Sequence, residues 1–312
     1  MEKINEKTIF KEKKNKVKFS LVIPIAPSRN AEILESIKKL DYPKSKFEVI
    51  VEKGTNPSEN RNRGIKKSKG EFIVFLDDDA LINQDYLKEV ERFFEKYPEA
   101  DLVGGPQLTP EENNIFAKIS DTLLTSNFGA FKVNKRYRKG EIILDADETM
   151  ITSANLCVKK EIFGKIDGFN SELYPGEDPE LISRAKKAKL AVAYSPNMIV
   201  YHKRRPNFTG FLSQIFLYGF TRPRKNKIAE ETKLFFLIPM LFTLYFMLMP
   251  FLFLLSNLFI IPLVAYILLA IIFAFYDSVR SRSLVNFFVL PLMYLFLHLS
   301  YGLGMMAGYG GR

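Results

Sequence analysis

The sequence is poor in residues that make covalent or soft-metal sites. It has no tryptophan, one cysteine (Cys157) and two histidines (His202 and His298) among 312 residues. A single cysteine excludes an intrachain disulfide and is consistent with a reducing compartment. With so few thiol and imidazole ligands, we do not expect a structural zinc site.

The N-terminus lacks the apolar stretch of a signal peptide. Residues 1–18 hold seven lysines against three glutamates, so we expect a basic tail there. Such a tail suits an anionic surface, although simple solvation explains it equally well.

The last third of the chain almost lacks charge. From residue 234 onward the only charged residues are Asp277, Arg280, Arg282 and Arg312. The uncharged run 234–276 would make about 65 Å of helix, twice the ~30 Å core of a bilayer. We therefore expect it to divide near residues 256–257, and with a third run to give transmembrane helices at about 234–255, 258–276 and 284–306.

A basic segment precedes these apolar runs. Residues 203–227 contain seven basic residues, no acidic residue and interleaved aromatic and aliphatic side chains. This pattern indicates an interfacial helix within 206–233. Nucleic-acid binding is the competing interpretation of such a patch, and the apolar runs that follow favour the membrane, so we expect no nucleic-acid partner. The positive-inside rule then predicts a multi-pass protein of the cell membrane with its first domain in the cytoplasm and its C-terminus outside.

Between residues 19 and 205, short apolar runs typical of buried strands alternate with segments of helical spacing. This alternation predicts an α/β fold with a doubly wound, mostly parallel sheet. The expected strands are 19–25, 47–51, 72–76, 102–103, 150–158, 191–194 and 198–201. The expected helices are 31–40, 57–69, 81–97, 115–124, 159–165 and 179–190, with a loop at 128–140.

The strand 72–76 ends in three adjacent carboxylates, Asp77, Asp78 and Asp79. Strand alternation would place Asp77 and Asp79 on one side and Asp78 on the other. Two oxygen ligands on one side suit Mg²⁺ or Mn²⁺. A solvated acidic turn is the alternative, but ligands of such sheets bind at the carboxyl ends of the strands, which favours a functional site.

Several motifs in order make residues 1–205 resemble the family 2 glycosyltransferases of GT-A fold, and the whole chain resembles their membrane-anchored members. The matching segments are LVIP at 21–24, RNRGI at 61–65, GEFIVFLDDD at 70–79, SAN at 153–155, FGKIDGF at 163–169, GEDPEL at 176–181 and His202 in VYHKRR.

The resemblance implies a role for each matched position. Asp178 would be the catalytic base. A divalent cation, Mg²⁺ or Mn²⁺, would be bound by Asp79, Asp77 and His202, although His202 could simply be a partly buried residue at a strand end. The nucleotide-sugar would contact Pro24, Glu52, Arg61, Asp77 and Asp78. The acceptor or its phosphate would meet Glu177, Arg204 and Arg205, with Glu177 also supporting the helix that follows it.

The chain also departs from the family pattern. Lys53 replaces the second acid that commonly follows the second strand, which puts the usual base contact in doubt. The Q-x-x-R-W mark of processive synthases is missing, which favours transfer of one sugar. The resemblance thus implies an inverting, metal-dependent hexosyltransferase that uses a nucleotide-sugar and a lipid-linked acceptor such as a polyprenyl phosphate. A non-catalytic membrane scaffold or nucleotide-sugar sensor is the alternative; a pore is disfavoured because the spans lack charged lining residues.

Overall fold

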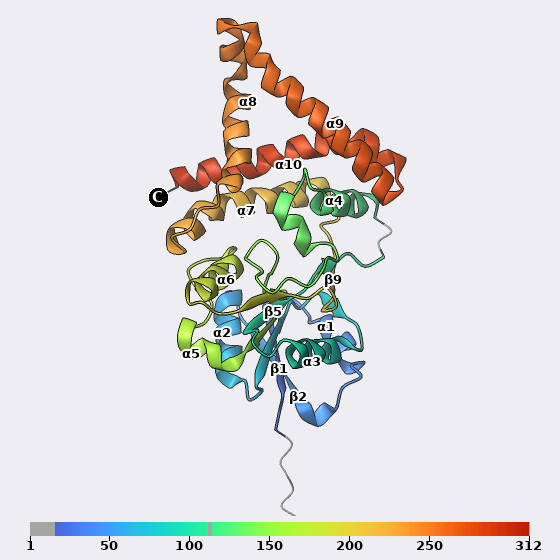
Figure 1. Cartoon of the computed structure of the whole chain (residues 1–312), viewed down its shortest axis with the longest axis vertical. Coiled ribbons are helices and arrows are strands. Elements are labelled where there is room, and N and C mark those ends of the chain that lie inside the picture. The colour runs from blue at the N-terminus through green and yellow to red at the C-terminus, as the bar shows by residue number, and fades with distance from the viewer. Residues whose placement is uncertain (1–15, 112–113, 312) are drawn as a thin grey trace, which may run out of the picture.

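The computed structural model describes residues 16–111 and 114–311, so the predicted basic tail falls almost entirely outside the described residues. An α/β domain forms the lower part of the molecule in Figure 1, and a set of long apolar helices forms the upper part. The boundary between them is occupied by α7 (Phe208–Ile228), at the place where the interfacial helix was expected.

A six-stranded sheet with the order β2-β1-β3-β7-β5-β8 forms the centre of the domain. All of its strands run parallel except β7, which is antiparallel to both of its neighbours. The central strands β1 and β3 are buried along their whole length, because helices cover both faces of the sheet. The strands are β1 (Phe19–Ile25), β2 (Phe47–Lys53), β3 (Phe72–Leu76), β5 (Leu102–Gly104), β7 (Asn155–Lys159) and β8 (Val192–Tyr194).

Two apolar cores lie on opposite faces of this sheet. One core contains α1 (Ile33–Lys38) and α3 (Tyr86–Lys96), and the other contains α5 (Phe163–Ile166) and α6 (Glu177–Lys187). The α2 helix (Pro57–Lys67) packs against β1 and β2 and contributes Ile65 to the second core. The predicted doubly wound, mostly parallel α/β fold is confirmed.

A small second sheet crosses the edge at which β3 ends. It has the order β4-β9-β6, with β4 (Ala80–Ile82) antiparallel to β9 (Val200–His202) and β6 (Gln107–Leu108) parallel to β9. Ala80 is paired with His202. This pairing brings the end of the domain back to the carboxylates that follow β3.

Some predicted boundaries are wrong. The helix expected from residue 81 begins only at Tyr86, because residues 80–82 pair with β9. The strand expected from residue 150 begins at Asn155, whose N–H closes a turn onto the carbonyl of Thr152. The helix expected at 179–190 begins two residues earlier, at Glu177.

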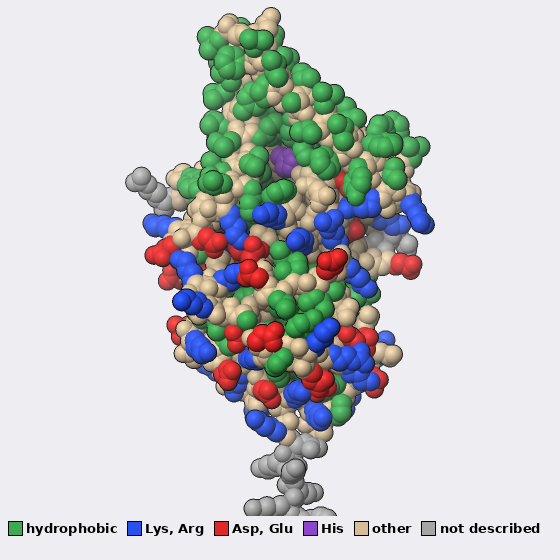
Figure 2. Space-filling view, viewed as in Figure 1, with side chains coloured by type: hydrophobic (Ala, Val, Ile, Leu, Met, Phe, Trp, Pro, Cys, Tyr) green, Lys and Arg blue, Asp and Glu red, His purple; other side chains and the backbone are tan. Residues whose placement is uncertain are grey.

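Three C-terminal helices have the length and apolar composition to cross a membrane, as predicted. The candidate segments are Leu234–Leu255, Asn257–Ser281 and Leu284–Gly310. In Figure 1, α8 (Ile238–Leu255) rises from the domain, α9 (Ile261–Ser281) returns, and α10 (Leu284–Gly310) lies beside α7. Figure 2 shows their hydrophobic surface, with lysines and arginines gathered just below it.

A third apolar core joins the helices to the domain. It contains residues of α4 (Ile115–Thr125), α7, α9 and α10. Phe128 of the domain reaches between the helices and contacts Tyr266, Phe273 and His298. His298 bonds to the Tyr266 hydroxyl at 2.9 Å and to the Phe128 carbonyl at 3.1 Å. His298 thus connects α10 to α9 and to the loop that contains Phe128.

Candidate active site

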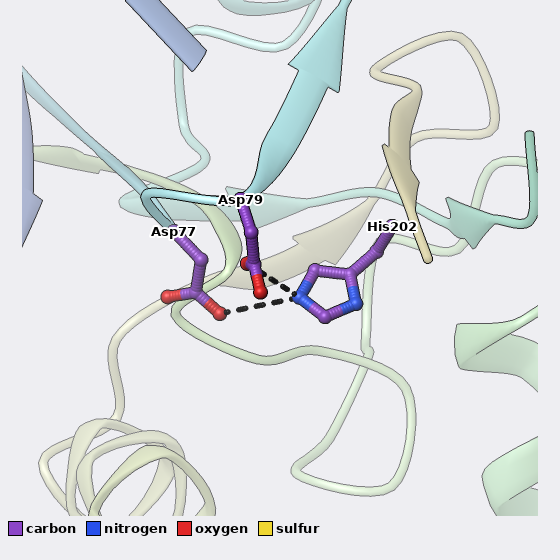
Figure 3. A group of neighbouring side chains, drawn as sticks. All are labelled: Asp77, Asp79 and His202. Carbon is purple, nitrogen blue, oxygen red and sulfur yellow. Dashed lines mark ion pairs between the residues drawn. The ribbon is translucent and has the colours of Figure 1, made fainter. Parts of the chain in front are cut away.

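Asp77, Asp79 and His202 converge at the carboxyl end of β3 (Figure 3). A tight turn, closed by the Ala80 N–H on the Asp77 carbonyl, follows the strand, and the β4–β9 pairing places His202 opposite the end of this turn. The His202 Nε2 atom lies 3.0 Å from Asp79 Oδ1 and 3.9 Å from Asp77 Oδ2. Asp77 and Asp79 therefore do share one side, but a turn and not continued strand alternation brings them there.

The donor set of these three residues fits a divalent cation. One ligand atom from each residue lies within 4.8 Å of the other two. The two carboxylate oxygens suit Mg²⁺ or Mn²⁺, and the imidazole nitrogen favours the softer Mn²⁺ of the two. Asp77, Asp79 and His202 can thus hold the cation that the family resemblance implies.

Positive charges already surround Asp79. Arg29, in the loop after β1, places its Nη2 atom 2.6 Å from Asp79 Oδ2. Burial would raise the pKa of Asp79, but His202 and Arg29 together hold that pKa well below its ordinary value. Burial likewise opposes protonation of His202, yet the bond to Asp79 raises the pKa of His202. The site is therefore built to keep Asp79 ionised, as a cation ligand must be.

Asp78 shares Arg29 with Asp79. Its side chain is buried, and its Oδ2 atom lies 3.2 Å from Arg29 Nε. Burial raises the pKa of Asp78 to about 6, although Arg29 opposes this shift. Its role as a nucleotide contact stays a prediction.

Arg61 connects the two halves of the site. It comes from the buried side of α2, with only 4% of its surface exposed. Its guanidinium donates to Asp77 Oδ1 at 3.0 Å and to Glu177 Oε1 at 2.9 Å. Arg61 therefore positions two carboxylates, and the predicted contact with the nucleotide would come in addition to these bonds.

The second half of the site is the beginning of α6. Gly176, whose φ of +126° favours glycine, precedes this helix and donates its N–H to the Glu177 carboxylate at 3.0 Å. Glu177 is thus held by the helix start and by Arg61, which supports its predicted structural role. Asp178 accepts a hydrogen bond from the Ser153 hydroxyl and is partly exposed.

A cavity of about 1680 Å³ contains this site and extends beyond it. Its lining includes Asp77, Asp79, Asp178 and His202 at the sheet edge. The same cavity is lined by apolar and aromatic residues of the three long helices: Ile238, Pro239, Phe242, Tyr266, Leu269, Phe273, Leu297 and Tyr301. The carboxylate site therefore opens continuously into the helical, membrane-type part of the protein.

The remaining predicted residues are placed differently from one another. Pro24 and the exposed Arg205 line the cavity. Arg204 also lines it, but its guanidinium is bound to Asp121 at 3.2 Å and to the Gln107 carbonyl at 2.9 Å. Glu52 is not among the described residues that line the cavity, because it pairs with Lys67 at 2.6 Å and Arg63 at 3.2 Å.

Sequence reasoning missed Arg29 and Phe128, which also line this cavity. Arg29 could have been found, since it follows β1 at the same sheet edge as the carboxylates. Phe128 could not, because its position depends on how the long helices pack on the domain. Arg222 lines the cavity, stacks on Phe236 at 3.8 Å, and forms no ion pair within the described residues.

A sequence model described as glycosyl transferase family group 2 matches residues 72–305, which include Asp77, Asp79, Asp178 and His202. The chain belongs to this family. The match covers most of the α/β domain as well as α7, α8, α9 and nearly all of α10. The predicted family 2 glycosyltransferase is thus confirmed at the level of the family.

Curated proteins similar to the chain are glycosyltransferases. The poly(ribitol-phosphate) β-N-acetylglucosaminyltransferase TarS of Staphylococcus aureus is 32% identical in an alignment 111 positions long, which covers 26% of this chain and 19% of TarS. The pre-mycofactocin glycosyltransferase of Mycobacterium tuberculosis is 23% identical over 185 residues, 59% of this chain and 36% of that protein. The chain thus spans a fifth to about a third of the length of these two relatives.

Among solved structures, a mannosyltransferase from Pyrobaculum calidifontis in complex with GDP-Man and Mn²⁺ has a TM-score of 0.49 and 14% identity. It covers 69% of this chain, and the match takes in 65% of that structure.

Proposed function

We propose that this protein transfers a single sugar from a nucleotide-sugar to a lipid-linked acceptor at the membrane surface, with inversion at the anomeric carbon. The observation that carries the proposal is the continuous cavity between the carboxylate site and the long apolar helices. A soluble acceptor would need no such extension, whereas the acyl or prenyl chain of a lipid requires apolar walls.

On the donor side, the chemistry is the departure of a nucleoside diphosphate from the anomeric carbon. A divalent cation held by Asp77, Asp79 and His202 would supply Lewis-acid stabilisation of the charge that develops on the diphosphate. Arg29 already lies at 2.6 Å from Asp79 and is a further cation at the same position. The contact with the base would fall to residues near Pro24, since Glu52 is engaged with Lys67 and Arg63.

On the acceptor side, Asp178 would act as the general base. An acceptor hydroxyl would form the new bond to the anomeric carbon as it passes its proton to Asp178, while the bond to the diphosphate breaks. The Ser153 hydroxyl, which donates to Asp178, would orient the carboxylate. An acceptor phosphate would attack without a base, so the dependence on Asp178 distinguishes the two kinds of acceptor.

An acidic headgroup would meet cations where the cavity passes from polar to apolar walls. Arg222 and Arg205 both line the cavity there, and Arg222 has no ion pair within the part of the chain that the structure describes. Guanidinium groups match phosphate oxygens in pairs. These two arginines are therefore the better phosphate ligands, since Arg204 is already bound to Asp121.

The test is transfer of label from nucleotide-sugars to lipid in membranes that contain the protein and Mn²⁺. We expect label to enter the organic phase with the wild type and with the control Asp85→Ala, an exposed aspartate outside the cavity. Asp79→Ala should abolish transfer. A non-catalytic scaffold or sensor would bind donor without transferring label, and equal transfer by Asp79→Ala and wild type would refute the proposed role of the site.

The distribution of basic residues indicates which side of the membrane the site would face. The basic residues of α7 and those of the α9–α10 turn lie below the hydrophobic surface in Figure 2, on the side of the α/β domain. By the positive-inside rule, that side and the active site on it would face the cytoplasm.

A further inference from the structure

The α7 helix lies flat on the α/β domain. Near its first residue, the Asn114 amide donates to the Pro206 carbonyl at 3.1 Å. Towards its end, Arg224 pairs with Glu172 at 3.5 Å, and beyond it Glu230 pairs with Lys187 at 3.1 Å. Both ends of a helix about 30 Å long are thus attached to the same domain. The helix runs along the domain surface and cannot project through a bilayer.

The α10 helix runs parallel to α7 in a constant register. The Phe208 and Phe296 rings are 5.2 Å apart, and the Ser300 hydroxyl donates to the Leu212 carbonyl at 2.8 Å. Gly304 and Gly308 approach the carbonyls of Phe216 and Phe220 so closely that a Cβ atom on either glycine would lie 2.1 Å from the oxygen. In all four contacts the α10 residue lies 88 positions after its α7 partner, so the two helices keep side by side over successive turns.

The composition of α10 also differs from that of α8 and α9. It is less hydrophobic than the other two, and a larger share of it is buried in the protein. Its exposed side chains are nonetheless large and apolar: Leu284, Val285, Phe288, Leu292 and Leu303. One side of α10 thus packs against the protein, and the other presents apolar side chains suited to contact with lipid acyl chains.

From these contacts we infer that α10 does not cross the membrane, but lies in the plane of one leaflet on the membrane side of α7. Helices that run parallel and in contact over several turns lie at the same depth in a bilayer. If α10 crossed the bilayer, α7 would have to cross with it and carry Arg222, Arg224, Lys225 and Lys227 into the hydrocarbon, which is unfavourable. Only α8 and α9 then cross, as a hairpin, and the C-terminal end of α10 stays on the side of the α/β domain.

This inference reverses the expectation that the C-terminus lies on the opposite side. That expectation counted three apolar helices as three crossings, and length and composition do not distinguish a helix that crosses from one that lies flat. Figure 1 shows the arrangement: α8 and α9 rise away from α7, whereas α10 returns along it.

Cysteine labelling tests the inference, and the chain provides a clean background. Its one native cysteine, Cys157, is fully buried, and burial raises the pKa of its thiol, so it should not react in the folded protein. Three reporters are compared in the full-length protein: Lys66→Cys in the domain, Asn257→Cys in the α8–α9 turn, and a polar tag with one cysteine fused after α10. Lys66 and Asn257 are both exposed. A membrane-impermeant maleimide is added to intact cells and to permeabilised cells.

We expect the tag to label under the same condition as Lys66→Cys, and Asn257→Cys under the other. Labelling of the tag together with Asn257→Cys, and apart from Lys66→Cys, would overturn the inference. Labelling of all three together would overturn the crossing of α8 and α9. Protease removal of the tag from sealed vesicles is a second measurement that alters no residue of the chain. Because neither readout depends on sugar transfer, the outcome is independent of the proposed function.

Discussion

Removal of the Arg61 charge should be the most destabilising single change in the site. Arg61 is 4% exposed and Glu177 is 3% exposed, so their 2.9 Å ion pair is buried from water. Arg61→Met keeps most of the side-chain volume and its packing on Phe169, where the ring centroid now lies 5.4 Å from the guanidinium carbon. The substitution leaves Glu177 buried without its cation.

The expected cost is set by that unpaired carboxylate. Breaking a buried pair by removing one partner costs about 3–5 kcal/mol, against a total stability of about 5–15 kcal/mol for an ordinary domain. For the α/β domain, residues 19–205, that corresponds to a fall in Tm of roughly 6–20 °C. The matched control is Lys66→Ala, an exposed residue of the same helix, for which the change should stay within about 0.5 kcal/mol.

The cost should also depend on pH, with a definite sign. Burial and the neighbouring Asp178 raise the pKa of Glu177 above its ordinary value of 4.5, and Arg61 is the largest influence that lowers it. Without Arg61 the pKa of Glu177 in the folded protein rises further. While a carboxyl group is protonated in both the folded and the unfolded protein, its raised folded-state pKa does not lower the free energy of unfolding. Wild type carries the same penalty up to about pH 8, the pKa of its Glu177 in the folded state, so the extra penalty of Arg61→Met develops as the pH rises above that value.

The measurement is thermal unfolding of the purified protein in detergent, for wild type, Arg61→Met and Lys66→Ala at about pH 6 and about pH 10, on either side of the pKa of Glu177. We expect the deficit of Arg61→Met to be clearly larger at the higher pH. A deficit of the same size at both pH values, or one no larger than that of Lys66→Ala, would refute the argument that a buried, uncompensated Glu177 causes the loss.

Three further predictions address the metal, the base and the helix packing. Arg29→Ala should tighten Mn²⁺ binding, measured by titration calorimetry, because the ion no longer competes with a guanidinium 2.6 Å from Asp79; weaker binding would contradict this. Asp178→Asn should lower turnover by about 10²–10⁴-fold without weakening donor binding if the acceptor is a hydroxyl, and by much less if it is a phosphate. Gly304→Ala should lower the Tm, because its Cβ atom would lie 2.1 Å from the Phe216 carbonyl oxygen, whereas Gly310→Ala, with no atom within 4 Å, should not.

The strands of the domain were predictable because their burial is two-sided. The runs 19–25 and 72–76 are apolar apart from Ser20, and the structure has β1 and β3 at those same residues. The acidic end of β3 was predictable for the same reason, since a parallel sheet presents such ends to ligands. His202 was reached only through the family motif, because the three-residue β4–β9 pairing that brings it to Asp79 leaves no periodic pattern in the sequence.

Other parts of the site depend on tertiary contacts that no local pattern encodes. Glu52 occupies the position of a family acid, yet Lys67 and Arg63 from the adjacent helix neutralise it. Arg204 and Arg205 look equivalent in sequence, but only Arg204 meets Asp121. The orientation of α10 also depends on tertiary contacts. Its glycines Gly304 and Gly308 meet α7 residues that lie 88 positions earlier in the chain.

The buried charges of the site also bear on whether it is a working centre or a remnant. Three carboxylates, Asp77, Glu177 and Asp178, are gathered around one buried arginine. Replacing such a cluster by apolar residues of similar volume is often neutral or stabilising, so the cluster has little value as a stabilising device. A scaffold or sensor that only had to fold and bind would gain from losing Glu177 and Arg61 together. The cluster is understandable if Asp77, on the donor side, and Asp178, on the acceptor side, must be held at fixed positions for one reaction. Arg61 can hold both sides, because it donates to Asp77 and to Glu177, the first residue of α6.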